Sequence, residues 1–196
     1  LTLFFSIFIG VLFILIGLKS EKNIILSEQI VLILLSFLFI PLLISIPYFS
    51  SIYNFSFINS YFEAMSGFSC TGFSMIQEVN FVNESLLLWR SNSQWIGGIF
   101  FLISIISTLG IKKIKIKPLY LIEGLYESGN FYNNFFKNSS KIFFIYVLLT
   151  LFIFILYIFS DIRFFDAFNL SLTVVSAGGF LPKDQLSSII HNNFQS

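Results

Sequence analysis

The residues most able to form a binding site in this sequence lie in two short glycine-bearing segments, Cys70–Phe73 and Ala177–Phe180. Glycine adopts backbone angles that other residues avoid, so an extended segment containing it can turn successive carbonyl oxygens toward one axis. Carbonyls left unpaired at membrane depth cost several kcal/mol each, and a cation can pair with them. Rings of such carbonyls replace the water around a potassium ion. The segments therefore predict a cation site built from main-chain oxygens, with potassium as the only metal ion.

Each segment follows an apolar stretch that is too short to cross a membrane. The run Ser60-Tyr61-Phe62-Glu63 has the form of a capping box, in which Ser60 caps a helix and Glu63 bonds back to the Ser60 amide. It predicts a helix over 60–69, roughly 15 Å long. Asp166 starts the second predicted helix, over 166–176. The alternative role of both acids is to raise the local cation concentration at a pore mouth.

The two half-helices and their glycine-bearing segments are related by a repeat. A shift of 107 residues places Asn59 on Asp166, Ser69 on Ser176, Gly72 on Gly179 and Phe73 on Phe180. A fixed shift of this kind indicates a repeated structural unit. The sequence therefore predicts a span, a half-helix and an extended glycine-bearing stretch, twice over.

The amino-acid composition indicates that these units lie in a membrane. Of the 196 residues, 56% are apolar and 11% are charged, whereas soluble domains are about 25% charged. The net charge of +1 argues against a nucleic-acid partner, and the single cysteine excludes an internal disulfide.

Because the chain starts on Leu1 without Met and stops at Ser196 in a polar stretch, we expect a fragment. Four stretches are long and apolar enough to span a bilayer as helices: 1–18, 29–49, 86–110 and 141–160.

Basic residues predict the orientation of these spans. The connections 19–28 and 111–140, with Lys141 at the edge of the second, hold eight of the eleven basic residues. Because Lys and Arg accumulate in cytoplasmic loops, we expect both connections inside the cell. The segments 50–85 and 161–196 are then external, and the chain is a multi-pass protein of the cell (inner) membrane.

Four strings resemble the TrkH branch of the Trk/Ktr/HKT potassium transporter family. They are YFEAMSGFSCTGFS (61–74), LLWRSNSQWIGG (87–98), YLIEG (120–124) and FFDAFNLSLTVVSAGGF (164–180), and the agreement in order covers about residues 24–185. The resemblance implies four repeats of helix, pore helix, filter strand and helix around one pore, incomplete here. It divides the chain into a truncated leading helix (1–18), a first repeat over 24–110 (span 29–49, pore helix 60–69, filter 70–74, span 86–110), a cytoplasmic connection (111–140) and a truncated second repeat over 141–196 (span 141–160, pore helix 166–176, filter 177–181).

The resemblance also assigns the candidate site. Cys70 and Ala177 stand where the family usually carries other residues, and Leu181-Pro182 replaces polar ones, which affects filter packing and the outer mouth more than coordination. The implied potassium ligands are the backbone carbonyls of Cys70, Thr71, Gly72, Phe73, Ala177, Gly178, Gly179 and Phe180.

A second motif precedes the apolar part of the third span. Arg90 is costly near a membrane unless it is paired, so it predicts a structural anchor whose partner is Glu63 or a pore-helix carbonyl. The tryptophans are either further anchors or an interface belt, and the paired glycines predict close helix packing. The group comprises Trp89, Arg90, Gln94, Trp95, Gly97 and Gly98.

The leading hypothesis for function is the ion-conducting subunit of a potassium uptake system, with potassium as substrate and no covalent cofactor. A sodium-conducting or sodium-coupled transporter is the alternative within the same class. An intramembrane enzyme is disfavoured because the sequence lacks a nucleophile–base pair within a span, and a membrane scaffold leaves the half-helices without a role. The resemblance adds a homodimer, a cytoplasmic nucleotide-binding regulatory subunit of the TrkA type, which Glu123 could contact, and surrounding lipid. His191 is expected to be inert.

Overall fold

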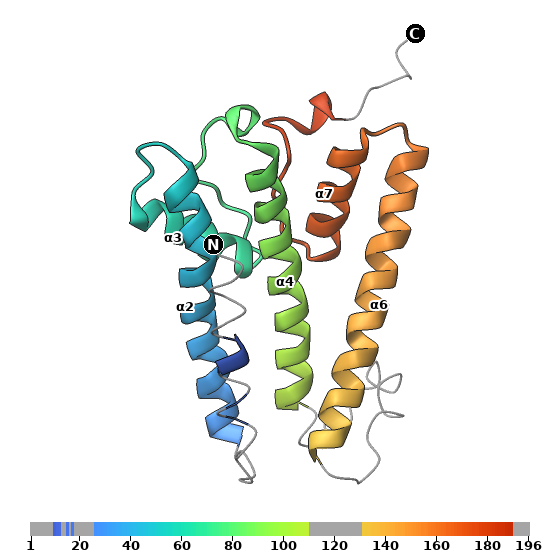
Figure 1. Ribbon diagram of the computed structural model, residues 1–196. Helices are drawn as coiled ribbons and strands as arrows, with labels where there is room; N and C mark the ends of the chain where they lie inside the picture. The colour runs from blue at the N-terminus through green and yellow to red at the C-terminus, as the bar shows by residue number, and fades with distance from the viewer. Residues whose placement is uncertain (1–9, 13–14, 16, 18–25, 110–130, 190–196) are drawn as a thin grey trace.

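The computed structural model describes residues 10–12, 15, 17, 26–109 and 131–189. That part of the chain is helical and contains no strand. Three long helices stand roughly side by side, with α4 between α2 and α6, and two short helices pack against them near one end (Figure 1). The elements in order are α2 (Leu26–Ser51), α3 (Phe57–Phe68), η1 (Val79–Phe81), α4 (Glu84–Leu109), α6 (Phe131–Phe159), α7 (Phe164–Val175) and η3 (Leu186–Ser188).

Two of the described helices are long and apolar enough to cross a membrane, over Ser27–Ser51 and Ser139–Phe159. The first contains the span predicted at 29–49, and Pro41 and Pro47 do not interrupt it. The second covers the span predicted at 141–160 except for its last residue. Many of their large apolar side chains are exposed, as expected where lipid is the solvent. The predicted span 1–18 lies mostly outside the described residues, as do the connections 19–28 and 111–140 over most of their length.

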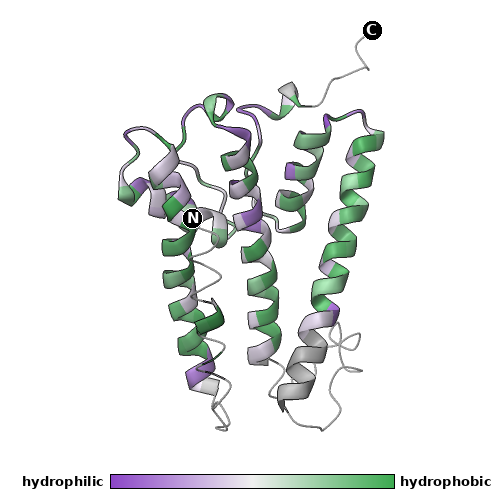
Figure 2. Ribbon diagram, in the orientation of Figure 1, coloured by the Kyte–Doolittle hydropathy of each residue, from purple (hydrophilic) through white to green (hydrophobic). Residues whose placement is uncertain are grey.

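The third predicted span, 86–110, corresponds to α4, which has 26 residues and is therefore about 39 Å long. Its length suffices to cross a bilayer, but its composition does not pass the same hydropathy criterion. α4 carries a polar band from Arg90 to Gln94 in its N-terminal half, and purple patches are seen in the upper half of this helix (Figure 2). Four of these five side chains are buried within the protein, so the polar groups of α4 face its neighbours.

The two half-helices start earlier than the sequence predicts, and the capping-box prediction is wrong. The N-cap of α3 is Ser56, whose hydroxyl accepts a hydrogen bond from the Asn59 amide at 3.2 Å. Ser60 lies inside the helix and donates to the Ser56 carbonyl oxygen at 3.0 Å. Since Ser56 supplies the same capping oxygen one turn earlier, the helix begins at Phe57, three residues before the predicted start.

The start of α7 requires the same correction. Its N-cap is Arg163, and Asp166 lies in the first turn rather than at the cap. A carboxylate in the first turn still favours the helix, because it faces the positive end of the helix dipole. Asp166 thus supports α7 without defining where the helix begins.

The repeat seen in the sequence is reproduced by the backbone. The 107-residue shift carries both ends of α3 onto the ends of α7, and the C-cap Ser69 onto Ser176. The residues with positive φ follow the same shift: Asn54 and Asp161 (both 56°), Cys70 and Ala177 (56° and 54°), and Gly72 and Gly179 (78° and 81°). The two copies therefore share one conformation through the half-helix and the segment after it.

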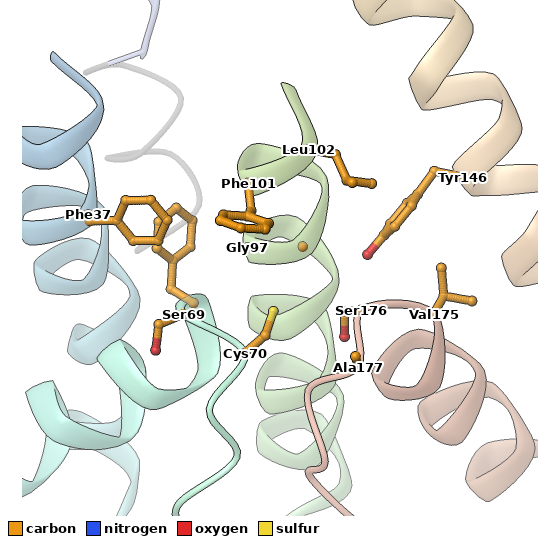
Figure 3. Close-up of a pocket in the computed structure, with 12 residues that line it drawn as sticks. Phe37, Ser69, Cys70, Gly97, Phe101, Leu102, Tyr146, Val175, Ser176 and Ala177 are labelled. Atoms are coloured by element: carbon orange, nitrogen blue, oxygen red, sulfur yellow. The ribbon is translucent and has the colours of Figure 1, made fainter. Parts of the chain in front are cut away.

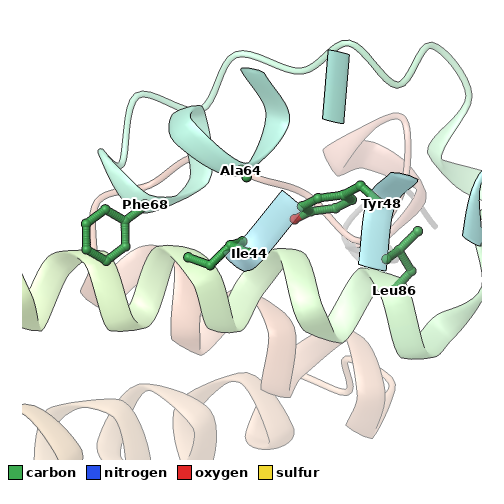
Figure 4. Packing of buried hydrophobic residues seen from close by; sticks show 5 residues of the cluster. All are labelled: Ile44, Tyr48, Ala64, Phe68 and Leu86. Atoms are coloured by element: carbon green, nitrogen blue, oxygen red, sulfur yellow. The ribbon is translucent and has the colours of Figure 1, made fainter. Parts of the chain in front are cut away.

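A small apolar core joins the first half-helix to the long helices. Five buried residues from α2, α3 and α4 form it: Ile44, Tyr48, Ala64, Phe68 and Leu86 (Figure 4). The Phe68 ring contacts Phe37 of α2 and Phe100 of α4, each with a centroid separation of 5.3 Å. Because one ring touches both long helices, the C-terminal end of α3 is held where the glycine-bearing segment begins.

Candidate functional site

Both half-helices end in the same left-handed turn. In the first, the Cys70 and Thr71 amides donate to the Gly67 and Ser66 carbonyl oxygens, each at 3.0 Å. In the second, the Ala177 and Gly178 amides donate to the Val174 and Thr173 carbonyl oxygens at 3.0 and 2.8 Å. This is the bonding of a helix C-cap in which the residue after the cap is left-handed. The chain therefore stops its helix abruptly and leaves as an extended segment.

The two glycine-bearing segments meet at Gly72. A Cβ added there would overlap the carbonyl oxygen of Gly178, and the φ of +78° is itself unfavourable for other residues. Gly179 has an equivalent φ of +81°. Glycine is thus required at Gly72 both for conformation and for the close approach of the other segment.

A buried ion pair connects α4 to the first segment. The Arg90 Nε lies 2.9 Å from Glu63 Oε1, so of the two partners that the sequence leaves open, the structure selects Glu63. The Glu63 carboxylate also accepts from the Ser74 hydroxyl at 3.0 Å and from the Met75 amide at 2.8 Å. Glu63 therefore fixes the end of the first segment instead of capping a helix.

Arg90 reaches the second segment as well. Its guanidinium carbon lies 4.2 Å from the centroid of the Phe180 ring, a cation–π distance. Its Nη1 points to the Leu181 carbonyl oxygen at 3.5 Å, and its Nη2 donates to the Ser74 hydroxyl at 3.1 Å. One side chain of α4 thus lies between the C-terminal ends of the two segments.

Gln94, one turn further along α4, contacts the second segment through both ends of its amide. Its Nε2 donates to the Gly178 carbonyl oxygen at 2.5 Å, and its Oε1 accepts from the Phe180 amide at 3.2 Å. The Gly178 carbonyl is one of the predicted ion ligands, and in the structure Gln94 takes one of its acceptor positions. On the other side, the Cys70 thiol donates to the Gln94 backbone carbonyl at 3.3 Å.

The paired glycines of α4 let both half-helix ends approach this helix. A Cβ on Gly97 would overlap the backbone of Phe68, at the end of α3. A Cβ on Gly98 would overlap the Tyr146 hydroxyl and Ser176, at the end of α7. The close packing predicted from these glycines therefore occurs against the two half-helices at once.

The tryptophans anchor α4 to the long helices. The indole Nε1 of Trp89 donates to the Ile44 carbonyl oxygen of α2 at 3.1 Å, and that of Trp95 to the Thr150 hydroxyl of α6 at 3.0 Å. The Trp95 ring also packs on Tyr146, with centroids 5.3 Å apart. Both indoles therefore bond within the protein, as anchors do.

A pocket of about 330 Å³ lies where the half-helices end. The C-cap residues Ser69 and Ser176 and the left-handed Cys70 and Ala177 contribute to its lining (Figure 3). Aromatic rings from the long helices line the rest, including Phe37, Phe101 and Tyr146. Since a helix carries partial negative charge at its C-terminal end, the electrostatics here favour a cation.

Ion pairs join the two copies at the N-terminal end of α7, opposite the pocket. The buried Asp166 carboxylate pairs with Arg163 at 3.1 Å and with Lys183 at 3.4 Å, and Arg163 also reaches Glu84 of α4 at 3.3 Å. The hydrogen bond to Asp166 raises the pKa of the Arg163 guanidinium, which therefore stays charged. The structure thus shows Asp166 in a structural ion pair, which is neither of the two roles that the sequence leaves open.

The sequence pattern does not indicate two further contacts. Asp184 accepts from the Val79 amide at 2.6 Å and from the Asn80 side chain, which joins the loops after the two segments. Ser74 bonds to Glu63 and Arg90, and only its place directly after a glycine-bearing segment could have indicated this.

The two copies differ in how far their phenylalanines are covered. Phe73 is 71% exposed, whereas Phe180, at the equivalent position of the repeat, is 2% exposed. Glu123 and His191 lie outside the described residues.

The sequence resembles known proteins along most of its length. The profile of the TrkH family, described as cation transport protein, matches residues 29–190. A cation transporter of Methanocaldococcus jannaschii is 34% identical over 177 residues, which are 90% of this chain and 36% of that protein. The Trk system potassium uptake protein TrkH of Halomonas elongata is 28% identical over 63% of this chain and 26% of its own length. That of Escherichia coli K12 is 26% identical over 69% of this chain and 29% of its own length.

The chain thus spans between about a quarter and just over a third of the curated relatives it matches. These relatives are named as transporters, in agreement with the prediction against enzymatic function. The helical architecture and the family match together confirm the predicted class of polytopic membrane protein. The family suggested by the four strings is confirmed by the profile match over most of the chain. The protein belongs to the TrkH family of cation transport proteins.

Proposed function

We propose that this chain supplies two filter segments of a pore that conducts potassium ions across the cell membrane. The observation that carries the proposal is the pair of identical turns at Cys70–Gly72 and Ala177–Gly179, placed against each other where two half-helices end. Short helices that stop within a bilayer leave polar backbone that must line a cavity or bind a solute. Extended main chain beside the negative ends of two helices suits a dehydrated monovalent cation.

The proposed ligands are main-chain oxygens of the two segments, and no cofactor takes part. The Gly178 carbonyl contributes least, because Gln94 already donates to it. Two segments enclose only part of an axis, so further segments must come from outside the described residues or from other chains. Relatives named as potassium uptake proteins favour potassium as the substrate, and sodium is the alternative.

A transport assay on serine variants tests this function. The complete open reading frame that contains these residues is expressed in a bacterial strain that lacks potassium uptake, and growth and uptake are measured at low potassium. We expect the wild type to restore growth and Gly72→Ser or Gly179→Ser to abolish it, because a side chain is strained at these φ values.

Gly17→Ser is the matched control, because nothing lies within 4 Å of a Cβ built on Gly17. The amount of each variant in the membrane fraction separates loss of transport from loss of protein. Uptake by both serine variants at the wild-type rate would refute the proposal. A wild type that takes up sodium in preference to potassium would replace potassium by the alternative ion.

We further propose a multi-pass arrangement with the connections 19–28 and 111–140 in the cytoplasm, a homodimer, and a nucleotide-binding regulatory partner of the TrkA type. The support is the distribution of basic residues and the naming of relatives as parts of a Trk system. Labelling of single cysteines introduced into the loop 52–56 or into 111–117 with an impermeant maleimide tests the orientation. Only the first set should react in intact cells.

A further inference from the structure

We infer that Gln94 is a positioning residue that holds the second glycine-bearing segment in register, and that residue 178 is glycine in order to receive it. The inference rests on the proposed function, because it concerns the ion selectivity of that same pore. It assigns to one amide of α4 a role in discriminating between ions without contact to the ion.

The bonding pattern is that of a neighbouring strand. The Gln94 amide donates to the carbonyl of Gly178 and accepts from the amide of Phe180, two residues later. A strand partner makes the same pair of opposite bonds on alternate residues. The side chain is fully buried, so water does not compete for either bond, and the segment between the two bonds has little freedom to shift.

Residue 178 is adapted to this contact and not to a special backbone angle. Gly72 and Gly179 have positive φ values, but Gly178 does not, so its conformation is open to alanine. A Cβ on Gly178 would instead overlap the side-chain amide of Gln94. The close approach of Gln94 is therefore the reason for glycine at this position.

The first copy supports this explanation. The 107-residue shift places Thr71 on Gly178, and there a full side chain is accommodated. The Thr71 hydroxyl bonds to Ser66 and Ser69 of its own turn, at 3.2 and 3.1 Å. The double glycine is thus present in the copy whose segment receives the glutamine.

Loss of Gln94 leaves a buried donor and a buried acceptor without their partner, which destabilises the segment. A segment that can shift is able to close around a smaller ion, so discrimination falls before conduction is lost. A residue that merely supported the fold would change the amount of protein and not the ratio of ions transported.

The test compares potassium and sodium uptake by the complete transporter in the deficient strain. We expect Gln94→Ala and the similarly sized Gln94→Leu to lower the potassium-to-sodium ratio by about tenfold, the effect of one buried bond. The control is Asn92→Ala, which removes an amide that donates within its own helix, to the Leu88 carbonyl oxygen at 2.9 Å. It should leave the ratio unchanged.

A double variant tests the fit between the two residues. Gly178→Ala should impair uptake because it displaces the Gln94 amide, and Gln94→Ala combined with Gly178→Ala should recover part of that loss. Such recovery is not expected if Gly178 is needed for its backbone alone. A wild-type ratio in both Gln94 variants, or no recovery in the double variant, would overturn the inference. The wild type separates this inference from the proposed function. If the wild type transports potassium selectively, the proposed function is retained even when the inference fails. If the wild type does not take up potassium, the proposed function itself is refuted.

Discussion

Arg90 Nε lies 2.9 Å from Glu63 Oε1, and the two side chains are 3% and 0% exposed. The pair joins α4 to the first half-helix, and its remaining hydrogen bonds go to residues that directly follow the two glycine-bearing segments. Removing either partner leaves the other charge buried and unpaired, which destabilises the folded state strongly. The pair therefore determines where the C-terminal ends of the two segments lie relative to each other.

Breaking this pair should destabilise the protein strongly. We expect Arg90→Met or Glu63→Gln to lower the free energy of unfolding by about 3–5 kcal/mol, because each leaves one buried charge without its partner. Thermal unfolding in detergent, followed by intrinsic fluorescence, measures the change. Glu84→Gln is the control, since the Glu84–Arg163 pair is more than half exposed and should contribute less than about 1 kcal/mol. Equal losses for the two glutamine variants would contradict this role of the buried pair.

A methyl group at Gly97 should separate α4 from the first half-helix. A Cβ there would overlap the Phe68 backbone, which cannot rotate away as a side chain could, so we expect Gly97→Ala to cost about 1–3 kcal/mol. Gly10→Ala meets nothing within 4 Å and should leave the melting temperature unchanged. A melting temperature of Gly97→Ala at or above that of the wild type would show that α4 adjusts freely.

The left-handed turns should tolerate alanine and reject branched residues. Cys70 has a φ of 56°, and its repeat mate is an alanine with a φ of 54°. We therefore expect Cys70→Ala to keep the melting temperature within a few degrees, whereas Cys70→Val lowers it by more, because branching at Cβ is unfavourable at positive φ. Equal melting temperatures for the two variants would show that the left-handed turn at Cys70 is not maintained.

Asp184 should hold together the two loops that follow the glycine-bearing segments. Its carboxylate accepts from the Val79 amide at 2.6 Å and from the Asn80 side chain. In Asp184→Ala we expect faster hydrogen exchange at Val79, measured by mass spectrometry, because that amide loses its acceptor. Asp161→Asn removes a carboxylate elsewhere and preserves a residue type that tolerates the φ of 56° at this position. Exchange at Val79 should be unaffected by that change.

The sequence by itself determined the membrane class, the half-helices and the repeat, because each rests on short-range patterns. A run of apolar residues sets whether a helix can span or only half enter the bilayer. Glycine at the same offset after each run predicts backbone angles that other residues avoid, and Gly72 and Gly179 do have positive φ values. The predicted helix start at 60 was wrong because Ser56 and Ser60 are equivalent caps in a local pattern. The predicted start at 166 was wrong because Asp166 lies in the first turn and not at the cap.

Only the tertiary structure decided which polar residues meet. Glu63 reads as a capping residue in the sequence, since a carboxylate one turn into a helix has the same pattern whether it bonds backward or to Arg90, 27 residues away. The contact between Gln94 and Gly178 joins positions 84 residues apart. Its partners are chosen by how α4 packs against both half-helices, where Gly97 and Gly98 allow a close approach. Packing of this kind depends on the whole set of helices at once, and no local pattern encodes it.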